Sequence, residues 1–78
     1  MAHILVVDDS PTETHIISMT LEKQGHQVST AVDGNDGVAK ATQLMPDLIL
    51  MDVVMPELNG FQATRQLNKQ ASTANIPI

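Results

Sequence analysis

The 78-residue sequence predicts an α/β fold, in which a doubly wound parallel sheet carries helices on both faces. Three observations lead to this class. Strand-like and helix-like segments alternate along the chain in the order βαβαβα. Two of the strand-like segments contain continuous apolar runs, Ile4–Val7 and Leu48–Met51, as expected of parallel strands that are covered on both faces. Each run is followed by aspartate, which predicts acidic side chains at one edge of the sheet.

The first strand, His3–Val7, leads into a helix with several start signals. Ser10 suits the N-cap, Pro11 suits the first helical position, and Glu13 is placed to close a capping box with Ser10. We expect Gly25 to end this helix, because glycine tolerates the positive φ that is common after a helix C-terminus.

The second strand and the second helix have weaker patterns. Gln27–Val32 alternates apolar with polar residues and predicts an edge strand. Asp33–Gly37 has the composition of a turn, which leads into a helix that Pro46 stops. The expected inward face of this helix consists of four residues at helical spacing, Val38, Ala41, Thr42 and Met45.

The third strand is expected at Asp47–Val53 and the third helix at Gly60–Gln70, with Phe61, Thr64 and Leu67 on its inward side. Strands that alternate with helices imply parallel pairing through right-handed crossovers. Because the first strand is strongly apolar and the second is weak, we expect the spatial strand order 2-1-3.

Composition excludes several classes of function. The chain carries a net charge of −5, which disfavours binding to nucleic acid or to an anionic membrane surface. It contains no cysteine, so neither a disulfide framework nor a thiolate metal site is available. No apolar run is long enough to span a bilayer, and no secretory leader precedes the first acidic residues. A cytoplasmic protein of one small domain is therefore expected.

The acidic residues at the strand ends are the candidate functional site. In the order 2-1-3, the switch point lies between the first and third strands, and ligands bind there at the carboxyl ends. Asp8, Asp9 and Asp52 occupy that place. Oxygen ligands without nearby histidine or cysteine suit Mg²⁺, and a carboxylate can also accept a phosphoryl group. Taken alone, the Asp8–Asp9 pair is about as often a solvated loop pair, or charge that complements a helix N-terminus, as a functional one. A single aspartate at a strand end, such as Asp52, is usually only exposed. Together at a switch point, the three aspartates favour function.

Particular segments resemble the receiver domains of two-component response regulators. They are Ile4–Ser10, Asp33–Gly34, Asp47–Pro56 and Asn59–Phe61, and the resemblance runs along all 78 residues. It implies a flavodoxin-like fold, of which residues 1–78 would form the N-terminal βαβαβα portion. The beginning of the chain and its third helix also resemble stand-alone regulators of type IV pilus twitching motility, which are not enzymes and lack a DNA-binding domain.

The resemblance also implies roles for individual residues. Asp52 would accept a phosphoryl group from the phosphohistidine of a histidine kinase or phosphotransfer protein. Asp8, Asp9 and Asp52 would bind Mg²⁺, with the backbone carbonyl of Val54 as a further ligand.

The chain departs from the family pattern at its end. Asn75–Ile78 resembles the entrance to a fourth strand, and strands four and five, with the family's hydroxyl and lysine residues, are absent. We expect either that the sequence is part of a longer receiver, or that the chain forms a homodimer, a swapped assembly or a complex with a partner. In the second case the exposed third strand would invite pairing.

Two alternatives to a working receiver remain. The first is an interaction fragment that no longer switches. The second is a Mg²⁺-dependent aspartyl-phosphate phosphohydrolase, which would carry a second acid two residues after Asp52, where this chain has Val54.

Overall fold

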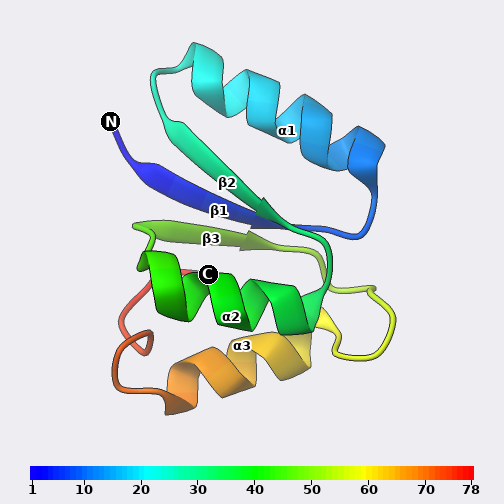
Figure 1. The fold of residues 1–78 in the computed structure, drawn as a ribbon, viewed down its shortest axis with the longest axis vertical. Helices are drawn as coiled ribbons and strands as arrows, with labels where there is room; N and C mark the ends of the chain where they lie inside the picture. Colours follow the sequence, from blue (N-terminus) through cyan, green and yellow to red (C-terminus); the bar gives the residue numbers. More distant parts are fainter.

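The computed structural model describes residues 1–78, and its elements alternate as the sequence predicts (Figure 1). In chain order they are β1 (His3–Val7), α1 (Pro11–Lys23), β2 (Gln27–Ala31), α2 (Gly34–Leu44), β3 (Leu48–Met51) and α3 (Gly60–Lys69). The predicted fold class is confirmed.

The three strands form a parallel sheet in the order β2-β1-β3, so the predicted order 2-1-3 is also confirmed. Val7, the last residue of β1, lies opposite Ala31 on one side and Met51 on the other. All three strands therefore finish level with one another. Strand β3 is shorter than the predicted Asp47–Val53, although the Asp52 N–H still donates to the Val7 carbonyl at 2.9 Å.

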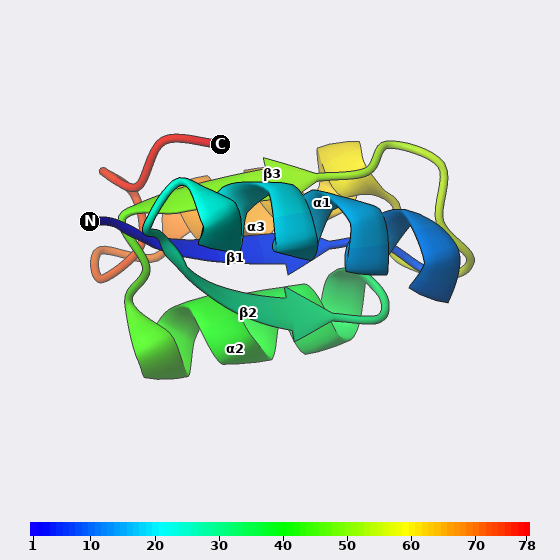
Figure 2. The same cartoon turned by 90° about the horizontal axis from the view of Figure 1, so that it is seen from above.

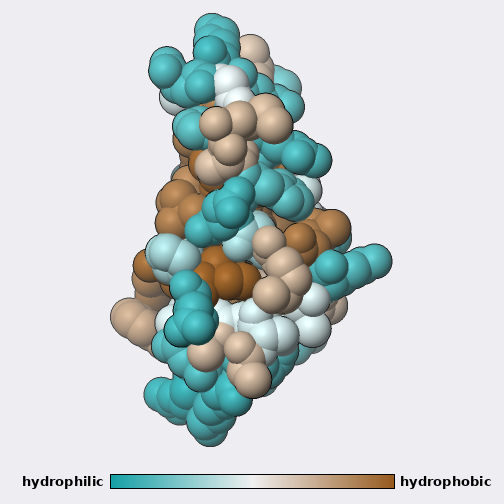
Figure 3. All heavy atoms as spheres, turned by 90° about the vertical axis from the view of Figure 1, so that its left-hand side faces the viewer, coloured by the Kyte–Doolittle hydropathy of each residue, from teal (hydrophilic) through white to brown (hydrophobic).

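The helices cover the two faces of the sheet unequally. Helices α2 and α3 lie together on one face, and α1 lies on the other face over β2 and β1 (Figures 1 and 2). Seen from the end at which the strands begin, apolar atoms gather across the middle of the molecule, with more polar atoms toward both ends (Figure 3).

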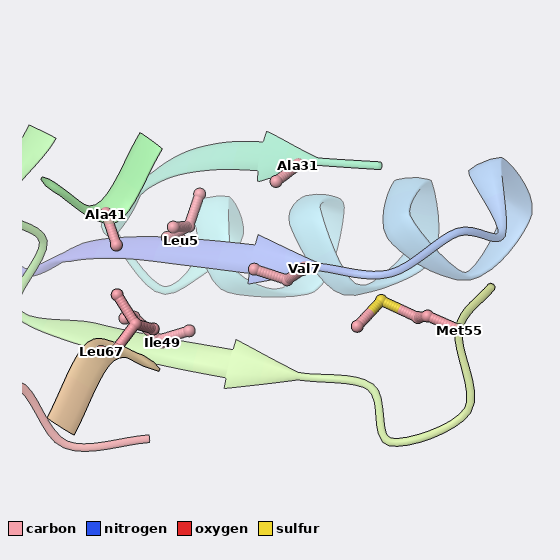
Figure 4. Packing of buried hydrophobic residues seen from close by; sticks show 7 residues of the cluster. All are labelled: Leu5, Val7, Ala31, Ala41, Ile49, Met55 and Leu67. Carbon is pink, nitrogen blue, oxygen red and sulfur yellow. The ribbon is translucent and has the colours of Figure 1, made fainter. Parts of the chain in front are cut away.

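The core lies between the sheet and the α2–α3 layer. It consists of Leu5, Val7, Ala31, Ala41, Ile49, Met55 and Leu67 (Figure 4). Helix α1 contributes no fully buried residue, because its inward residues Ile17 and Leu21 are only half-buried. The α1 face of the sheet is thus the thinly covered one.

The start of α2 differs from the prediction. Gly34 to Gly37, predicted as a turn, form the first turn of the helix, because the Asp33 side chain caps it by accepting the Asp36 N–H at 2.7 Å. At its other end Met45, predicted on the inward helical face, is an exposed left-handed cap with φ of 50°. The helix ends before Met45 can turn inward.

The inward face of α3 also differs in part from the prediction. Leu67 is buried as expected, but Gly60 and Ala63 accompany it instead of Phe61 and Thr64. Phe61 is 68% exposed. Helix α3 packs against α2, and its Leu67 belongs to the core cluster with Ile49 of β3. At the start of the helix a small residue is required, because a Cβ on Gly60 would meet the Asp52 backbone carbonyl.

The last residues begin to follow the free edge of β3. The Ile49 N–H donates to the Pro77 carbonyl at 2.9 Å, although no fourth strand is formed. None of the helices α1, α2 and α3 combines the length and the hydrophobicity of a membrane-spanning segment.

Candidate metal and phosphoryl-acceptor site

Three carboxylates meet at the carboxyl end of the sheet. Asp8 directly follows β1, Asp9 is next to it, and Asp52 directly follows β3. Each offers a carboxylate oxygen, and these oxygens lie within 4.8 Å of one another. The convergence that strand order predicted is therefore observed.

The sheet itself positions two of these aspartates. Because Val7 pairs with Met51, the next residue of each strand comes out at the same level. The Asp8 N–H donates to the Ala31 carbonyl at 3.1 Å, and the Asp52 N–H donates to the Val7 carbonyl at 2.9 Å. Both side chains thus project from backbone that is still held by sheet-type hydrogen bonds.

Burial differs among the three acids. Asp8 is only 7% exposed, Asp52 is half-buried and Asp9 is exposed. One Asp8 oxygen, Oδ1, accepts the Ser10 N–H at 2.9 Å. This bond fixes one oxygen of the most buried carboxylate.

No basic side chain forms an ion pair with the cluster. The one ion pair of the molecule joins Lys40 to Asp36 at 3.3 Å, within α2. Several converging negative charges without a protein cation repel one another, and a divalent cation would offset that repulsion. Three carboxylates, with neither histidine nor cysteine among them, fit the oxygen preference of Mg²⁺.

A fourth carboxylate, Glu13, is associated with the cluster. Its pKa is raised above the ordinary 4.5, first by a hydrogen bond with the Asp8 carboxyl and then by the negative charge of Asp8. Desolvation and the charges of Asp52 and Asp9 add to this effect. The sequence did not predict that Glu13 interacts with the acidic cluster, because Glu13 was predicted to cap α1.

The loop after β3 carries the remaining predicted ligand. Val54 lies two residues beyond Asp52 and is 81% exposed. The next residue, Met55, is buried and points back toward Val7 (Figure 4). The loop is thus anchored immediately after Val54, close to the carboxyl end of β1.

Two glycines allow this loop to lie close to its neighbours. A Cβ on Gly60 would be 2.2 Å from the Asp52 carbonyl oxygen, and one on Gly34 would be 2.1 Å from the Leu58 carbonyl oxygen. Such distances leave no room for a side chain. The loop from Asp52 to Gly60 is therefore held against both the strand end and the start of α2.

A hollow of about 610 Å³ adjoins the cluster beside the free edge of β3, with Ile17 of α1 and residues of α3 in its lining. Asp8 and Asp52 lie at its border, and most of its lining is apolar. Phe61 and Thr64, the α3 residues that were predicted to face the core, line this hollow instead.

The sequence and the fold have many known relatives. Residues 4–78 match the family model of the response regulator receiver domain. Protein PilH of Pseudomonas aeruginosa PAO1 is 63% identical over all 78 residues, and the chain spans 64% of the length of PilH.

Solved structures give the same picture. The chemotaxis protein CheY4 of Vibrio cholerae superposes with a TM-score of 0.94 at 38% identity, over 100% of this chain and 65% of that one. The receiver domain of the sensor histidine kinase PA1611 from P. aeruginosa PAO1 gives a TM-score of 0.94 at 35% identity, over 99% of this chain and 63% of that one. That second structure contains a magnesium ion coordinated in its active-site cleft.

Proposed function

The chain belongs to the response regulator receiver family, and on that basis we propose that it is a phosphoacceptor module of a two-component signalling pathway, with Asp52 as the acceptor. The observation that carries this proposal is the convergence of Asp8, Asp9 and Asp52 at the end of the sheet. Phosphoryl transfer brings a carboxylate nucleophile close to phosphoryl oxygens, and all of these groups are negatively charged. A cation held by such a cluster of carboxylates would offset that charge.

The chemistry assigned to Asp52 is a simple displacement. A carboxylate oxygen of Asp52 attacks the phosphorus of a phosphohistidine on a histidine kinase or phosphotransfer protein. A P–O bond forms as the P–N bond breaks, the electron pair leaves with the imidazole, and the product is an aspartyl phosphate. The half-buried position of Asp52 at a strand end would leave one oxygen free for in-line attack.

Asp8, Asp9 and Asp52 would hold Mg²⁺, with the backbone carbonyl of Val54 as a further oxygen ligand. When bound, Mg²⁺ would offset the negative charge that accumulates between the carboxylates and the phosphoryl oxygens. The acid-only donor set supports this choice of metal.

The module is proposed to be a receiver of phosphoryl groups and not a turnover enzyme. An aspartyl-phosphate phosphohydrolase would need a second acid two residues after its nucleophile to act on the leaving group. Here that residue is Val54, which has no group that transfers protons. This difference favours signalling over hydrolysis.

The pathway is proposed to be the control of type IV pilus twitching motility. The similarity to PilH supports this, since it extends over the whole chain at 63% identity. A fluorescently labelled copy of the protein, introduced into a strain that lacks its own twitching-motility regulator, should restore twitching on a surface. An Asp52→Asn copy should not restore it.

The phosphoacceptor assignment is tested by intact-protein mass spectrometry. The full-length protein is incubated with MgCl₂ and acetyl phosphate, which loses acetate when its phosphoryl group is transferred. We expect a mass gain of one phosphoryl group that is lost in Asp52→Asn and when EDTA replaces MgCl₂. Glu57→Gln is the matched control, because Glu57 is an exposed acid of the same loop and should leave the gain intact. No gain in the unaltered protein would rule the proposal out.

A further inference from the structure

Asn59–Gly60 is the one step of the chain in which glycine follows asparagine, and it lies at the N-terminus of α3. In such a step the glycine nitrogen can attack the carbon of the asparagine carboxamide, because glycine has no side chain to obstruct the approach. A C–N bond forms and ammonia leaves, and the resulting succinimide takes up water to give aspartate or iso-aspartate. The other asparagines precede residues with side chains, and they are Asn35, Asn68 and Asn75.

The fold holds both of the groups that would react. The buried Gly60 donates its N–H to the Val53 carbonyl at 3.0 Å. Asn59 Oδ1 accepts the Gln62 N–H at 2.9 Å, and Gln62 Oε1 accepts the Asn59 N–H at 3.0 Å, which completes a capping box. Attack requires the Gly60 nitrogen to lose its proton and the Asn59 carboxamide to turn toward that nitrogen. The reaction therefore starts only after these hydrogen bonds open.

The two products of the reaction differ in their main chain. Aspartate leaves the main chain unchanged, and it caps a helix about as well as asparagine does. Iso-aspartate routes the main chain through the former side chain and so adds one carbon atom before Gly60. The backbone has no spare room there, since even a Cβ on Gly60 would overlap the Asp52 carbonyl oxygen. Iso-aspartate at this step would thus displace the strand end from which Asp52 projects.

We propose that Asn59 is a deamidation site that the capping box of α3 keeps closed, and that opening of the loop between β3 and α3 controls the reaction. This loop comprises residues 52–59 and leaves the sheet before it returns to the start of α3 (Figure 1). Local openings of this kind cost less free energy than global unfolding. The reaction consumes only water, so neither a metal ion nor a phosphoryl group takes part. Each iso-aspartate is a permanent record of an opening next to Asp52.

The experiment is peptide mapping by mass spectrometry of the full-length protein, incubated at mildly alkaline pH in buffer and in guanidinium chloride. We expect Asn59 to deamidate in the denaturant and to react at least about tenfold more slowly in buffer, where the closed state dominates. Gln62→Ala removes the acceptor of the Asn59 N–H and should raise the rate in buffer about fivefold, the effect of losing one ordinary hydrogen bond. Gln66→Ala makes the same change one turn further along α3, at an exposed position, and should leave the rate unchanged.

Amide NMR spectra that match outside α3 would show that both variants are folded. Equal rates in buffer and in denaturant would overturn protection by the fold, and equal rates for Gln62→Ala and Gln66→Ala would overturn the role of the capping box. If Asn59 does not deamidate even in the denaturant, the site itself is overturned.

The displacement of Asp52 has a separate test. Protein refolded after incubation in denaturant is separated by chromatography, and its iso-aspartyl form is compared with Asn59→Asp, which has the same charge on an unaltered main chain. We expect the iso-aspartyl form to show a shifted Asp52 amide resonance and a lower urea midpoint, whereas Asn59→Asp keeps both close to those of the unaltered protein. Identical spectra and midpoints for the two forms would show that the loop accommodates the added carbon, against the proposed displacement.

Discussion

At the scale of single residues, Asp8 and Glu13 compete for one backbone donor, the Ser10 N–H. The Asp8 carboxylate accepts this N–H, because Asp8 is only two residues away and its strand holds it beside Ser10. The sequence pattern of a capping box contains no information about this competitor, so the free carboxylate of Glu13 could not be predicted. The aspartates could be predicted, because the level ends of parallel strands determine where Asp8 and Asp52 project.

The acidic cluster should lower the stability of the metal-free fold as the pH rises. The pKa of Glu13 is raised in the folded state above its ordinary value of 4.5, so the folded state binds the proton more tightly than the unfolded state. Stability then falls as the pH rises from about 4.5 through the folded pKa, since the native state holds more protons there. Below 4.5 this cost disappears.

Glu13→Gln should remove this pH dependence. In EDTA, we expect its urea midpoint to exceed that of the unaltered protein at pH 7, and the difference to vanish at pH 4. Urea unfolding followed by circular dichroism across this pH range measures the effect, with Glu22→Gln as the control for loss of one charge on α1. A lower midpoint for Glu13→Gln than for Glu22→Gln at pH 7 would contradict the expected repulsion.

At the scale of secondary-structure elements, close backbone approaches determine which side of α3 faces inward, and the periodic pattern of apolar residues does not. The order and type of all six elements follow from apolar spacing and turn residues. The inward face of α3 does not, because the pattern ranks Phe61 above Gly60 and Ala63 by hydrophobicity. Contact with α2 and with the end of β3 favours the small residues, and that requirement comes from the tertiary arrangement.

Gly60 therefore links helix α3 to the functional site. Gly60→Ala would place its Cβ 2.2 Å from the Asp52 carbonyl oxygen, which is backbone and cannot move aside alone. We expect a loss of about 1–3 kcal/mol in the free energy of unfolding, as for other overpacked sites. Amide resonances around Asp52 should shift as the strand end is displaced.

Gln66→Ala is the control for this change, because it is an exposed position of the same helix and should alter stability by less than about 0.5 kcal/mol. Denaturant unfolding gives the stability, and amide NMR gives the displacement. Equal stabilities for Gly60→Ala and Gln66→Ala would show that the loop has room to relax.

At the scale of the whole molecule, the two faces of the sheet are covered to different extents. Helices α2 and α3 bury one face, whereas on the other face α1 lies over β2 and β1 (Figure 2). The strand order that causes this asymmetry was predictable from the contrast between the apolar first strand and the weak second one. The hollow beside β3 was not predictable in detail, since it depends on where α1 and Phe61 come to lie.

The hollow gives the 78-residue chain an apolar surface that should promote self-association. It measures about 610 Å³, and Ile17, Leu50 and Ile78 are among the residues that line it. Exposed apolar surface of this kind is a site of association in soluble proteins. Leu50 is 36% exposed, so a lysine there can reach solvent without disturbing the core on the opposite face of the sheet.

Leu50→Lys should therefore shift the 78-residue chain toward the monomer in sedimentation velocity, measured across a range of protein concentrations. Gln66→Lys adds the same charge on the exposed side of α3, away from the hollow, and should leave the association of the chain unchanged. The comparison separates the loss of apolar surface from the change in net charge, which by itself alters repulsion between molecules. Identical sedimentation of the two variants would show that the hollow is not the contact surface, and a strictly monomeric unaltered chain would show that α1 already covers enough of β3.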